Sequence, residues 1–130
     1  MRAKCVEDLQ IWQRAMEFWK VINAILDRPR LASDRKLHDQ LSDAADSIVS
    51  NIAEGFEQPT DRAFANYLYT AKGSTAEART RLQLAHLRGY IETTEYNERD
   101  KLGDELARMI TGLIKYLLRS NRRNRGLGPK

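Results

Sequence analysis

Cysteine is almost missing from this sequence, since Cys5 is the only one among 130 residues. A single cysteine excludes an intrachain disulfide and fits a protein that works in a reducing compartment. No stretch approaches the roughly 18 consecutive apolar residues that a membrane-spanning helix needs. The first residues also lack the apolar run of a secretory signal, because acids appear at Glu7 and Asp8. We therefore expect a cytoplasmic protein that does not associate with membranes.

Proline and glycine are scarce as well, with three and seven residues, and the sequence has neither alternating apolar runs nor solenoid repeats. Instead, apolar residues recur at spacings of three and four, the pattern of amphipathic helices. The four segments with this pattern are about 8–26, 33–56, 61–88 and 93–118. Short connections between long helices make neighbours antiparallel. The sequence predicts an all-α, up-down-up-down four-helix bundle in one domain, residues 1–118.

Capping residues and helix breakers mark the ends of these segments. Pro29 and Gly89 end the first and third segments. Ser33 or Asp34 begins the second, and Thr60 begins the third. The fourth begins at Thr93 or Thr94, with acids in its first turn.

Two of the segments carry more apolar surface than one core requires. In the first, Ile11, Phe18, Val21 and Ile25 widen a stripe that already holds Trp12 and Trp19. In the third, a second stripe lies opposite the one assigned to the core, and it consists of Ala65, Tyr69, Gly73, Ala76, Leu84 and Leu87. Exposed apolar stripes of this size usually mark interfaces. We expect this stripe to be the interface of a homo-oligomer.

The net charge of +4 is unevenly distributed. From Arg119 onward there are five basic residues and no acid, which leaves 17 basic and 18 acidic residues before that point. This polar, glycine-containing stretch, 119–130, is predicted to be a disordered tail. Arginine suits phosphate because its guanidinium offers forked donors. The predicted nucleic-acid-binding residues are Arg119, Arg122, Arg123, Arg125 and Lys130.

Two further charge patterns lie on the second and third segments. The second carries a column of acids, namely Asp39, Asp43, Asp46, Glu54 and Glu57. The third has five basic residues against one acid between Arg62 and Arg88. We expect the acid column to pair with Lys72, Arg79 or Arg81 of a neighbouring subunit.

No constellation of catalytic or metal-ligating residues is apparent. His38 and His86 lie on different segments and lack partners at ligand spacing. The run Lys72–Thr75 has the wrong order for a phosphate-binding loop and lies within a helix. Glu54 and Glu77 lack the Glu-x-x-His units of carboxylate-bridged metal sites. We predict no enzyme, no metal and no cofactor, and we expect Asn51, Glu54 and Glu77 to make hydrogen bonds between helices or subunits.

The sequence resembles a known family in four stretches, of which two are the most specific. These are Ser-Ile-x-x-Asn-Ile-Ala-Glu-Gly at residues 47–55 and Gly-Ser-x-x-Glu at 73–77; the others are 9–15 and 64–68. In order and spacing they are similar to the four-helix-bundle proteins encoded by intervening sequences in bacterial 23S rRNA genes. That family in turn resembles the accessory protein of diversity-generating retroelements, which binds nucleic acid.

The resemblance covers about residues 8–91 and implies a bundle that assembles into a ring, commonly a homopentamer, without catalysis. The retroelement proteins are basic over a broad surface, whereas here the part before residue 119 is nearly neutral. Two functions remain open. One is an oligomeric accessory protein that binds RNA or DNA through its basic tail and local basic faces. The other is a scaffold that binds another protein and has no nucleic-acid role.

Overall fold

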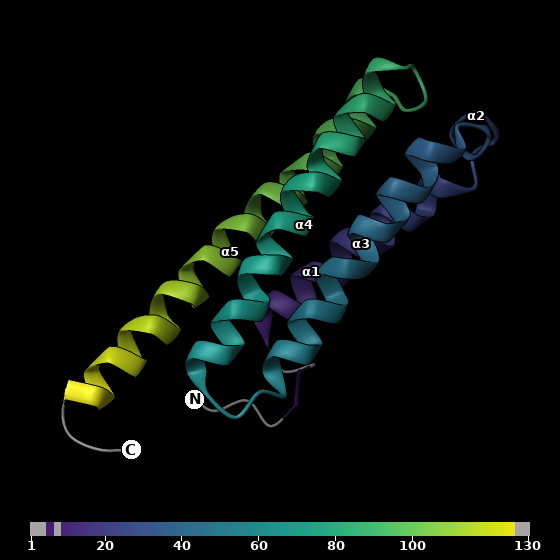
Figure 1. Cartoon of the computed structure of the whole chain (residues 1–130). Helices are drawn as coiled ribbons and strands as arrows, with labels where there is room; N and C mark the ends of the chain where they lie inside the picture. Colours follow the sequence, from purple (N-terminus) through teal and green to yellow (C-terminus); the bar gives the residue numbers. More distant parts are fainter. Residues whose placement is uncertain (1–4, 7–8, 127–130) are drawn as a thin grey trace.

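The computed structural model describes residues 5–6 and 9–126, with side chains up to residue 119. This part of the chain is helical, without strands, and its long helices alternate in direction (Figure 1). The helices are α1 (Gln10–Leu26), α2 (Pro29–Ser33), α3 (Arg35–Phe56), α4 (Asp61–Leu87) and α5 (Thr93–Gly126). The predicted all-α, up-down-up-down bundle is confirmed.

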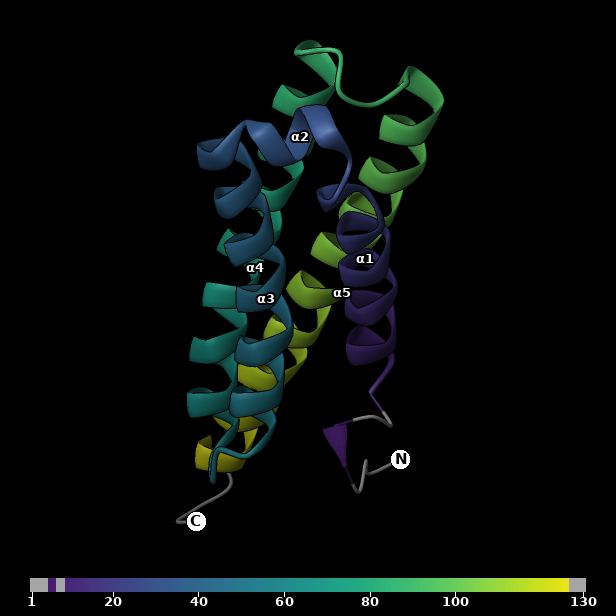
Figure 2. The same cartoon turned by 90° about the vertical axis from the view of Figure 1, so that its right-hand side faces the viewer.

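The four long helices surround one hydrophobic core. α1 packs against α3 and α5, and α4 packs against the same two helices, so α1 and α4 are diagonally opposed. The short α2 crosses one end of the bundle between α1 and α3 (Figure 2). No described helix combines the length and the apolar composition that crossing a bilayer would require.

Residues predicted to mark the helix ends do so in the structure. Asp34 Oδ1 accepts a hydrogen bond from the amide of Leu37 at 3.4 Å, and Thr60 Oγ1 accepts one from the amide of Ala63 at 3.1 Å. Gly89 follows α4 with a φ of 77°, the left-handed conformation that glycine adopts without strain. These residues satisfy backbone groups that helix ends leave unpaired.

The short helix α2 is not predicted by the sequence, and it fills the expected break after α1. Pro29 stands at its first turn, where a missing amide hydrogen costs nothing. Leu31 is fully buried and holds this turn against the core. A five-residue helix is too short to show an apolar period, so only tertiary packing defines it.

The core side of α1 is centred differently from the prediction. Ile11, Phe18 and Ile25 are buried, whereas Trp12 and Trp19 are only partly buried against the core. Trp19 also donates from Nε1 to Asp46 Oδ1 of α3 at 2.8 Å. Most of the extra apolar face of α1 is therefore used within the bundle, and it gives little support to an oligomer.

The predicted disordered tail is wrong for residues 119–126, because α5 continues as a helix to Gly126. The segment contains no proline before that point, and arginine is a good helix former. Extending an existing helix costs little, since nucleation has already been achieved. α5 therefore runs past the α3–α4 connection (Figure 1). Residues 127–130 lie outside the described part.

Gly55 allows α3 and α4 to approach closely. A Cβ atom here would lie 2.8 Å from Tyr67 Cβ and 2.9 Å from Phe64 Cδ1. Gly55→Ala is therefore expected to lower the free energy of unfolding by about 1–3 kcal/mol through overpacking. Urea denaturation followed by circular dichroism measures the change.

The control for Gly55→Ala is Gly73→Ala, because a Cβ at Gly73 would have no neighbour within 4 Å. Helix propensity then predicts no loss and up to about 1 kcal/mol of gain. Equal effects of the two substitutions on the urea midpoint would contradict the packing explanation.

Candidate functional site

The predicted nucleic-acid-binding residues belong to the last turns of α5 and the segment after it. Arg119 is exposed. Arg122, Arg123 and Arg125 occupy helical positions, but their side chains are beyond the described ones, and Lys130 lies outside the described residues. The structure therefore has a helix, in place of the predicted disordered tail, over most of this site.

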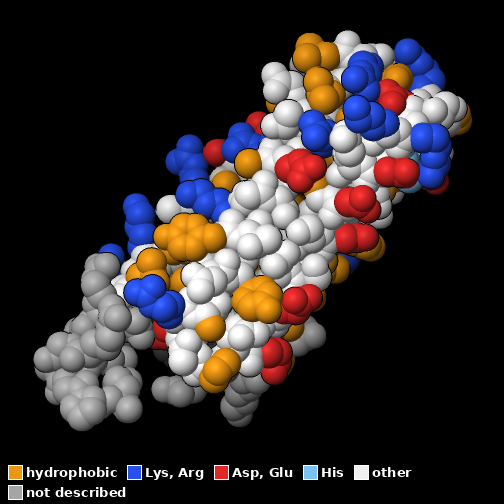
Figure 3. Space-filling view, in the orientation of Figure 1, with side chains coloured by type: hydrophobic (Ala, Val, Ile, Leu, Met, Phe, Trp, Pro, Cys, Tyr) orange, Lys and Arg blue, Asp and Glu red, His pale blue; other side chains and the backbone are white. Residues whose placement is uncertain are grey.

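The same helix carries further basic residues that were not predicted as part of the site. Lys101, Arg108, Lys115 and Arg119 are all exposed. Their spacings of seven, seven and four place them within an arc of roughly 40° on the side away from the core. Figure 3 shows Lys and Arg side chains along the α5 edge of the molecule. We call these four residues the α5 basic column. Their helical spacing is the sequence feature from which the column could have been predicted.

The acids of α5 belong largely to ion pairs with other helices. Arg79 Nε donates to Asp100 Oδ1 at 2.8 Å, and Arg14 Nη1 donates to Glu105 Oε1 at 2.6 Å. Glu95 accepts two hydrogen bonds from Arg28. These pairs attach the first half of α5 to α1, to α4 and to the connection between α1 and α2, and they neutralise three of its acids.

Beyond Glu105, the charge of the chain has one sign. Residues 106–130 hold seven of the 22 basic residues and none of the 18 acidic ones. This segment therefore carries a formal charge of +7, and the rest of the chain carries −3. Lys115 and Arg119 have no ion-pair partner among the described side chains, and Arg108 pairs only with Asp104 of its own helix, at 3.1 Å. The field of this half-helix is therefore strongly positive.

The ion pair of Arg28 with Glu95 gives a pH-dependent contribution to stability. The hydrogen bonds from Arg28 lower the pKa of Glu95 from 4.5 to about 2. A lowered carboxyl pKa stabilises the fold above the unfolded value, and this stabilisation is lost as the pH falls from 4.5 towards 2. Glu95→Gln should therefore melt below the parent protein at neutral pH, and the gap should close across that window.

Thermal melts at several pH values test this prediction, with Glu98→Gln as the control. Glu98 is exposed on α5 and has no ion pair within the described residues. Its substitution should leave the melting temperature nearly unchanged at every pH. A gap for Glu95→Gln that stayed constant down to the folded-state pKa of about 2 would contradict the assignment.

The third predicted segment, now α4, is not an open basic face. Arg79 contacts Asp100 and lies 3.6 Å from Asp104, and Arg88 pairs with Asp34 at 2.8 Å. Arg81 lies 3.7 Å from Glu77. Of the basic residues described on α4, only Arg62 and Lys72 are exposed without an ion pair. Of the three bases expected to pair with a neighbour's acid column, Arg79 is thus engaged by α5, and Arg81 lies near Glu77 without a hydrogen bond to it. Lys72 has no ion pair in the described part.

The predicted interface stripe lies on the outer side of α4, with one exception. The side chains of Tyr69 and Leu87 are 52% and 70% exposed. Gly73 and Ala76 are also exposed, and Leu84 is partly buried. This outer surface lies between the acid column of α3 and the basic edge of α5 (Figure 3).

Ala65 is the exception, and its assignment to the interface is wrong. It is fully buried within the chain. It precedes Arg79 by about four helical turns on nearly the same side of α4, and Arg79 contacts α5. Position 65 therefore faces α5 and belongs to the core.

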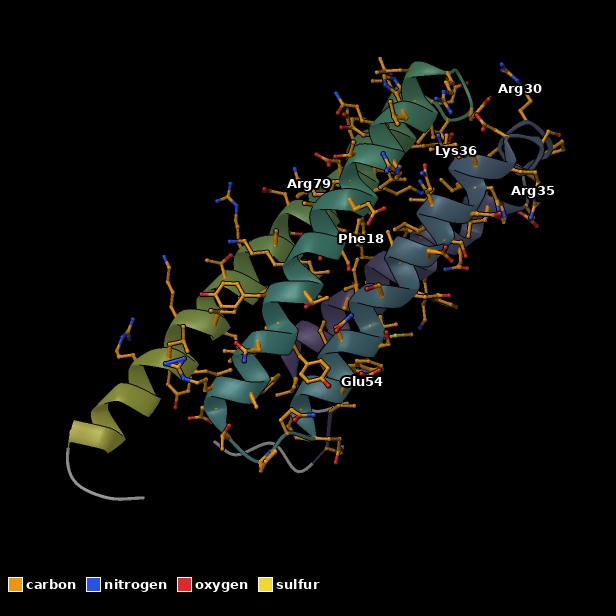
Figure 4. The ribbon with its side chains drawn as sticks, in the orientation of Figure 1. Phe18, Arg30, Arg35, Lys36, Glu54 and Arg79 are labelled. Atoms are coloured by element: carbon orange, nitrogen blue, oxygen red, sulfur yellow. The ribbon has the colours of Figure 1, made fainter. Side chains whose placement is uncertain are left out.

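None of the three polar residues predicted to make hydrogen bonds between helices does so among the described residues, and hydrogen bonds between subunits stay a prediction. Asn51 Nδ2 donates to the Ser47 carbonyl at 2.8 Å and to Ser47 Oγ at 3.1 Å, both within α3. The link between helices comes from Ser47, whose Oγ shares a hydrogen bond of 2.7 Å with Ser74 Oγ of α4. Glu54 is exposed at the surface of α3 (Figure 4). Glu77 pairs only along its own helix.

The two histidines have structural partners. His86 stacks on Tyr96 with ring centroids 5.1 Å apart and shares a hydrogen bond with Thr93. His38 Nδ1 lies 2.9 Å from Asp39 Oδ1. Within the described residues, no three His, Cys, Asp or Glu side chains gather as a metal site would require.

One surface cavity, with a volume of about 380 Å³, is apolar. It lies between the start of α1 and the middle of α5, beside the α5 basic column. Its lining is Leu9, Gln10, Ile11, Met109, Gly112 and Leu113. No titratable group lines it, so it offers shape and apolar surface but no acid–base chemistry.

The fold and the charge pattern define a class: small all-α bundle proteins with one strongly basic helix edge. A family model described as the 23S rRNA-intervening sequence protein matches residues 7–112, and the chain belongs to this family. The match extends past the predicted 8–91 into the first half of α5.

One solved structure supports the fold. It is a protein of unknown function from the S23 ribosomal protein family of Bacteroides thetaiotaomicron, with 22% identity and a TM-score of 0.73. The alignment covers 81% of this chain and 98% of that chain. A comparison with curated proteins gives no match.

Proposed function

We propose that this protein is a non-catalytic accessory protein that assembles into a ring-shaped homo-oligomer and binds RNA or DNA through α5. The observation that carries the proposal is the acid-free segment from residue 106 onward, with its formal charge of +7, together with the exposed α5 basic column. Counterion release from the phosphate backbone favours such a surface without any sequence readout. The proposed setting is the cytoplasm.

Multiple copies of α5 on one particle would strengthen this binding. One helix offers few phosphate contacts, which gives weak affinity at physiological salt. Several helices on one assembly act at high effective concentration once the first is bound. The proposal therefore links nucleic-acid affinity to assembly.

The surface around α4 supports the assembly part of the proposal. Acidic side chains follow α3 on one edge and basic side chains follow α5 on the other (Figure 3). The outer side of α4 between them carries Tyr69, Gly73, Ala76 and Leu87. Unlike edges favour head-to-tail contacts, which close into rings when the rotation allows it. The family resemblance suggests five subunits.

The test of nucleic-acid binding is a salt titration. Fluorescence anisotropy with labelled RNA and duplex DNA, at several salt concentrations, should give a log affinity that falls linearly with log salt. A slope near zero, or no binding at low salt, would contradict the proposal and leave a protein-binding scaffold.

The test of assembly is light scattering on the full chain. A molar mass of several times 15.0 kDa is expected. Gly73→Leu should reduce this mass without unfolding, because its side chain would enter open space on the outer side of α4. Lys20→Leu, at an exposed position of α1, is the control and should leave the mass unchanged. A monomer for the parent chain would contradict the ring.

A further inference from the structure

A second polar site lies at the other end of the bundle from the C-terminal half of α5. It is a pocket of about 310 Å³ between the first turn of α3 and the last turns of α4. The residues that line it are Asp34, Lys36, Leu37, Gln40, Arg81, Leu84 and Arg88. Figure 4 shows Lys36 on the side of α3 that faces α4, whereas Arg35 lies on the outer side. Three of the lining side chains are cationic and one is acidic.

The single acid of the pocket is already neutralised. Asp34 accepts hydrogen bonds from Tyr90 Oη and from Arg88 Nη1, both at 2.8 Å. These bonds, that of Tyr90 above all, hold the pKa of Asp34 below its usual range. Asp34 is therefore an anchored carboxylate that fixes Arg88, and it is not an acceptor for the other two cations.

Lys36 and Arg81 are left without a strong partner. Lys36 has no ion pair within the described residues. Arg81 lies 3.7 Å from Glu77, which is beyond hydrogen-bond distance. Its Nε is buried and has no hydrogen-bond acceptor. Buried donors in native proteins normally have a partner, and an orphaned one calls for an explanation.

The remaining lining suits a small anion. The amide of Gln40, which also lines the pocket, offers two further donors. Leu37 and Leu84 supply apolar surface beside the charges. A planar guanidinium with a lysine ammonium and an amide beside it offers donors that suit the several oxygens of a phosphate.

We propose that this pocket binds a phosphate group, with Lys36 and Arg81 as the principal ligands and Gln40 as a further donor. The group can belong to a free nucleotide or to a nucleic acid, because the recognised chemistry is the same. This site is separate from the α5 basic column, and its occupation does not depend on the proposed function.

The experiment uses isothermal titration calorimetry of the full chain with inorganic phosphate and with AMP. Sodium chloride of equal ionic strength is the reference. Saturable binding of either phosphate compound is expected. Arg81→Gln and Lys36→Gln should each weaken it by roughly tenfold, since a hydrogen bond to a charged group is removed. Arg35→Gln is the matched control, because Arg35 neighbours Lys36 but pairs with Asp39 outside the pocket.

A second arm separates the two sources of phosphate. Short oligonucleotides with and without a 5′-phosphate are titrated into the same proteins, and circular dichroism verifies that each variant is folded. If oligonucleotides bind and AMP does not, and the two substitutions reduce that binding, the proposal stands with a nucleic-acid phosphate as ligand. No binding of any phosphate probe, or equal binding by the parent and both variants, would overturn it.

Loss of the α5 basic column distinguishes this site from the proposed function. A triple variant of the α5 basic column should leave AMP binding unchanged, because its three positions lie outside the pocket. The substitutions are Arg108→Gln, Lys115→Gln and Arg119→Gln. If that variant loses AMP binding while Arg81→Gln retains it, the phosphate site is on α5 and the pocket assignment is wrong.

Discussion

Phe18→Ala is expected to lower the free energy of unfolding by about 3–5 kcal/mol, because it leaves a cavity in a close-packed core. Phe18 is fully buried on α1. Its Cζ lies so close to α5 that a Cβ on Gly103 would be only 2.9 Å away. A domain of this size has a total stability of about 5–15 kcal/mol, so much of it would be lost. Urea denaturation at fixed protein concentration measures the change.

Met16→Ala is the control for this prediction, since Met16 lies on α1 and is only partly buried. Its cost should be clearly smaller, because part of its surface is already in water. If Met16→Ala cost as much as Phe18→Ala, the centre of the core would lie on the stripe that the sequence indicates. The comparison requires that the slope of the free energy of unfolding against urea concentration is the same in both variants and in the parent protein.

Phe18 shows which features of the fold can be predicted from sequence periodicity and which cannot. The four long helices follow from the apolar period together with Asp34, Thr60 and Gly89 at their ends. Periodicity does not give the centre of a wide apolar face, because on α1 neighbouring stripes fit the helical period equally well. For that reason the sequence places Phe18 at the flank of the core stripe. The positions of α3 and α5 in the folded bundle decide which apolar stripe of α1 becomes buried.

Contacts between helices account for the other differences. Ala65 fits an outer stripe by spacing, but it is fully buried within the chain. Pairs such as Arg79 with Asp100 depend on how two helices are aligned, which the spacing within each helix does not specify. The free basic surface of α4 is therefore smaller than the sequence indicates. That of α5 is larger, because Lys101, Arg108 and Lys115 are exposed along it before the predicted tail begins.

Removal of residues 119–130 is expected to reduce nucleic-acid affinity at least about tenfold, because each subunit loses five basic residues and no acid. The bundle should survive, since α5 projects past the α3–α4 connection at this end (Figure 1). Light scattering should find an unchanged subunit number. The slope of log affinity against log salt should become shallower by about 0.9 for each phosphate that α5 no longer neutralises.

A matched pair of triple variants locates the remaining binding. The first variant removes three charges from the α5 basic column without shortening the helix, through Arg108→Gln, Lys115→Gln and Arg119→Gln. It should lower both the affinity for nucleic acid and the dependence of that affinity on salt. The second variant, with Lys20→Gln, Arg35→Gln and Arg62→Gln, removes the same charge from exposed positions on α1, α3 and α4. Affinity should then change little. Equal losses of affinity in the two triple variants would show that binding follows net charge alone. Unchanged affinity after removal of residues 119–130 would place the nucleic acid on another surface.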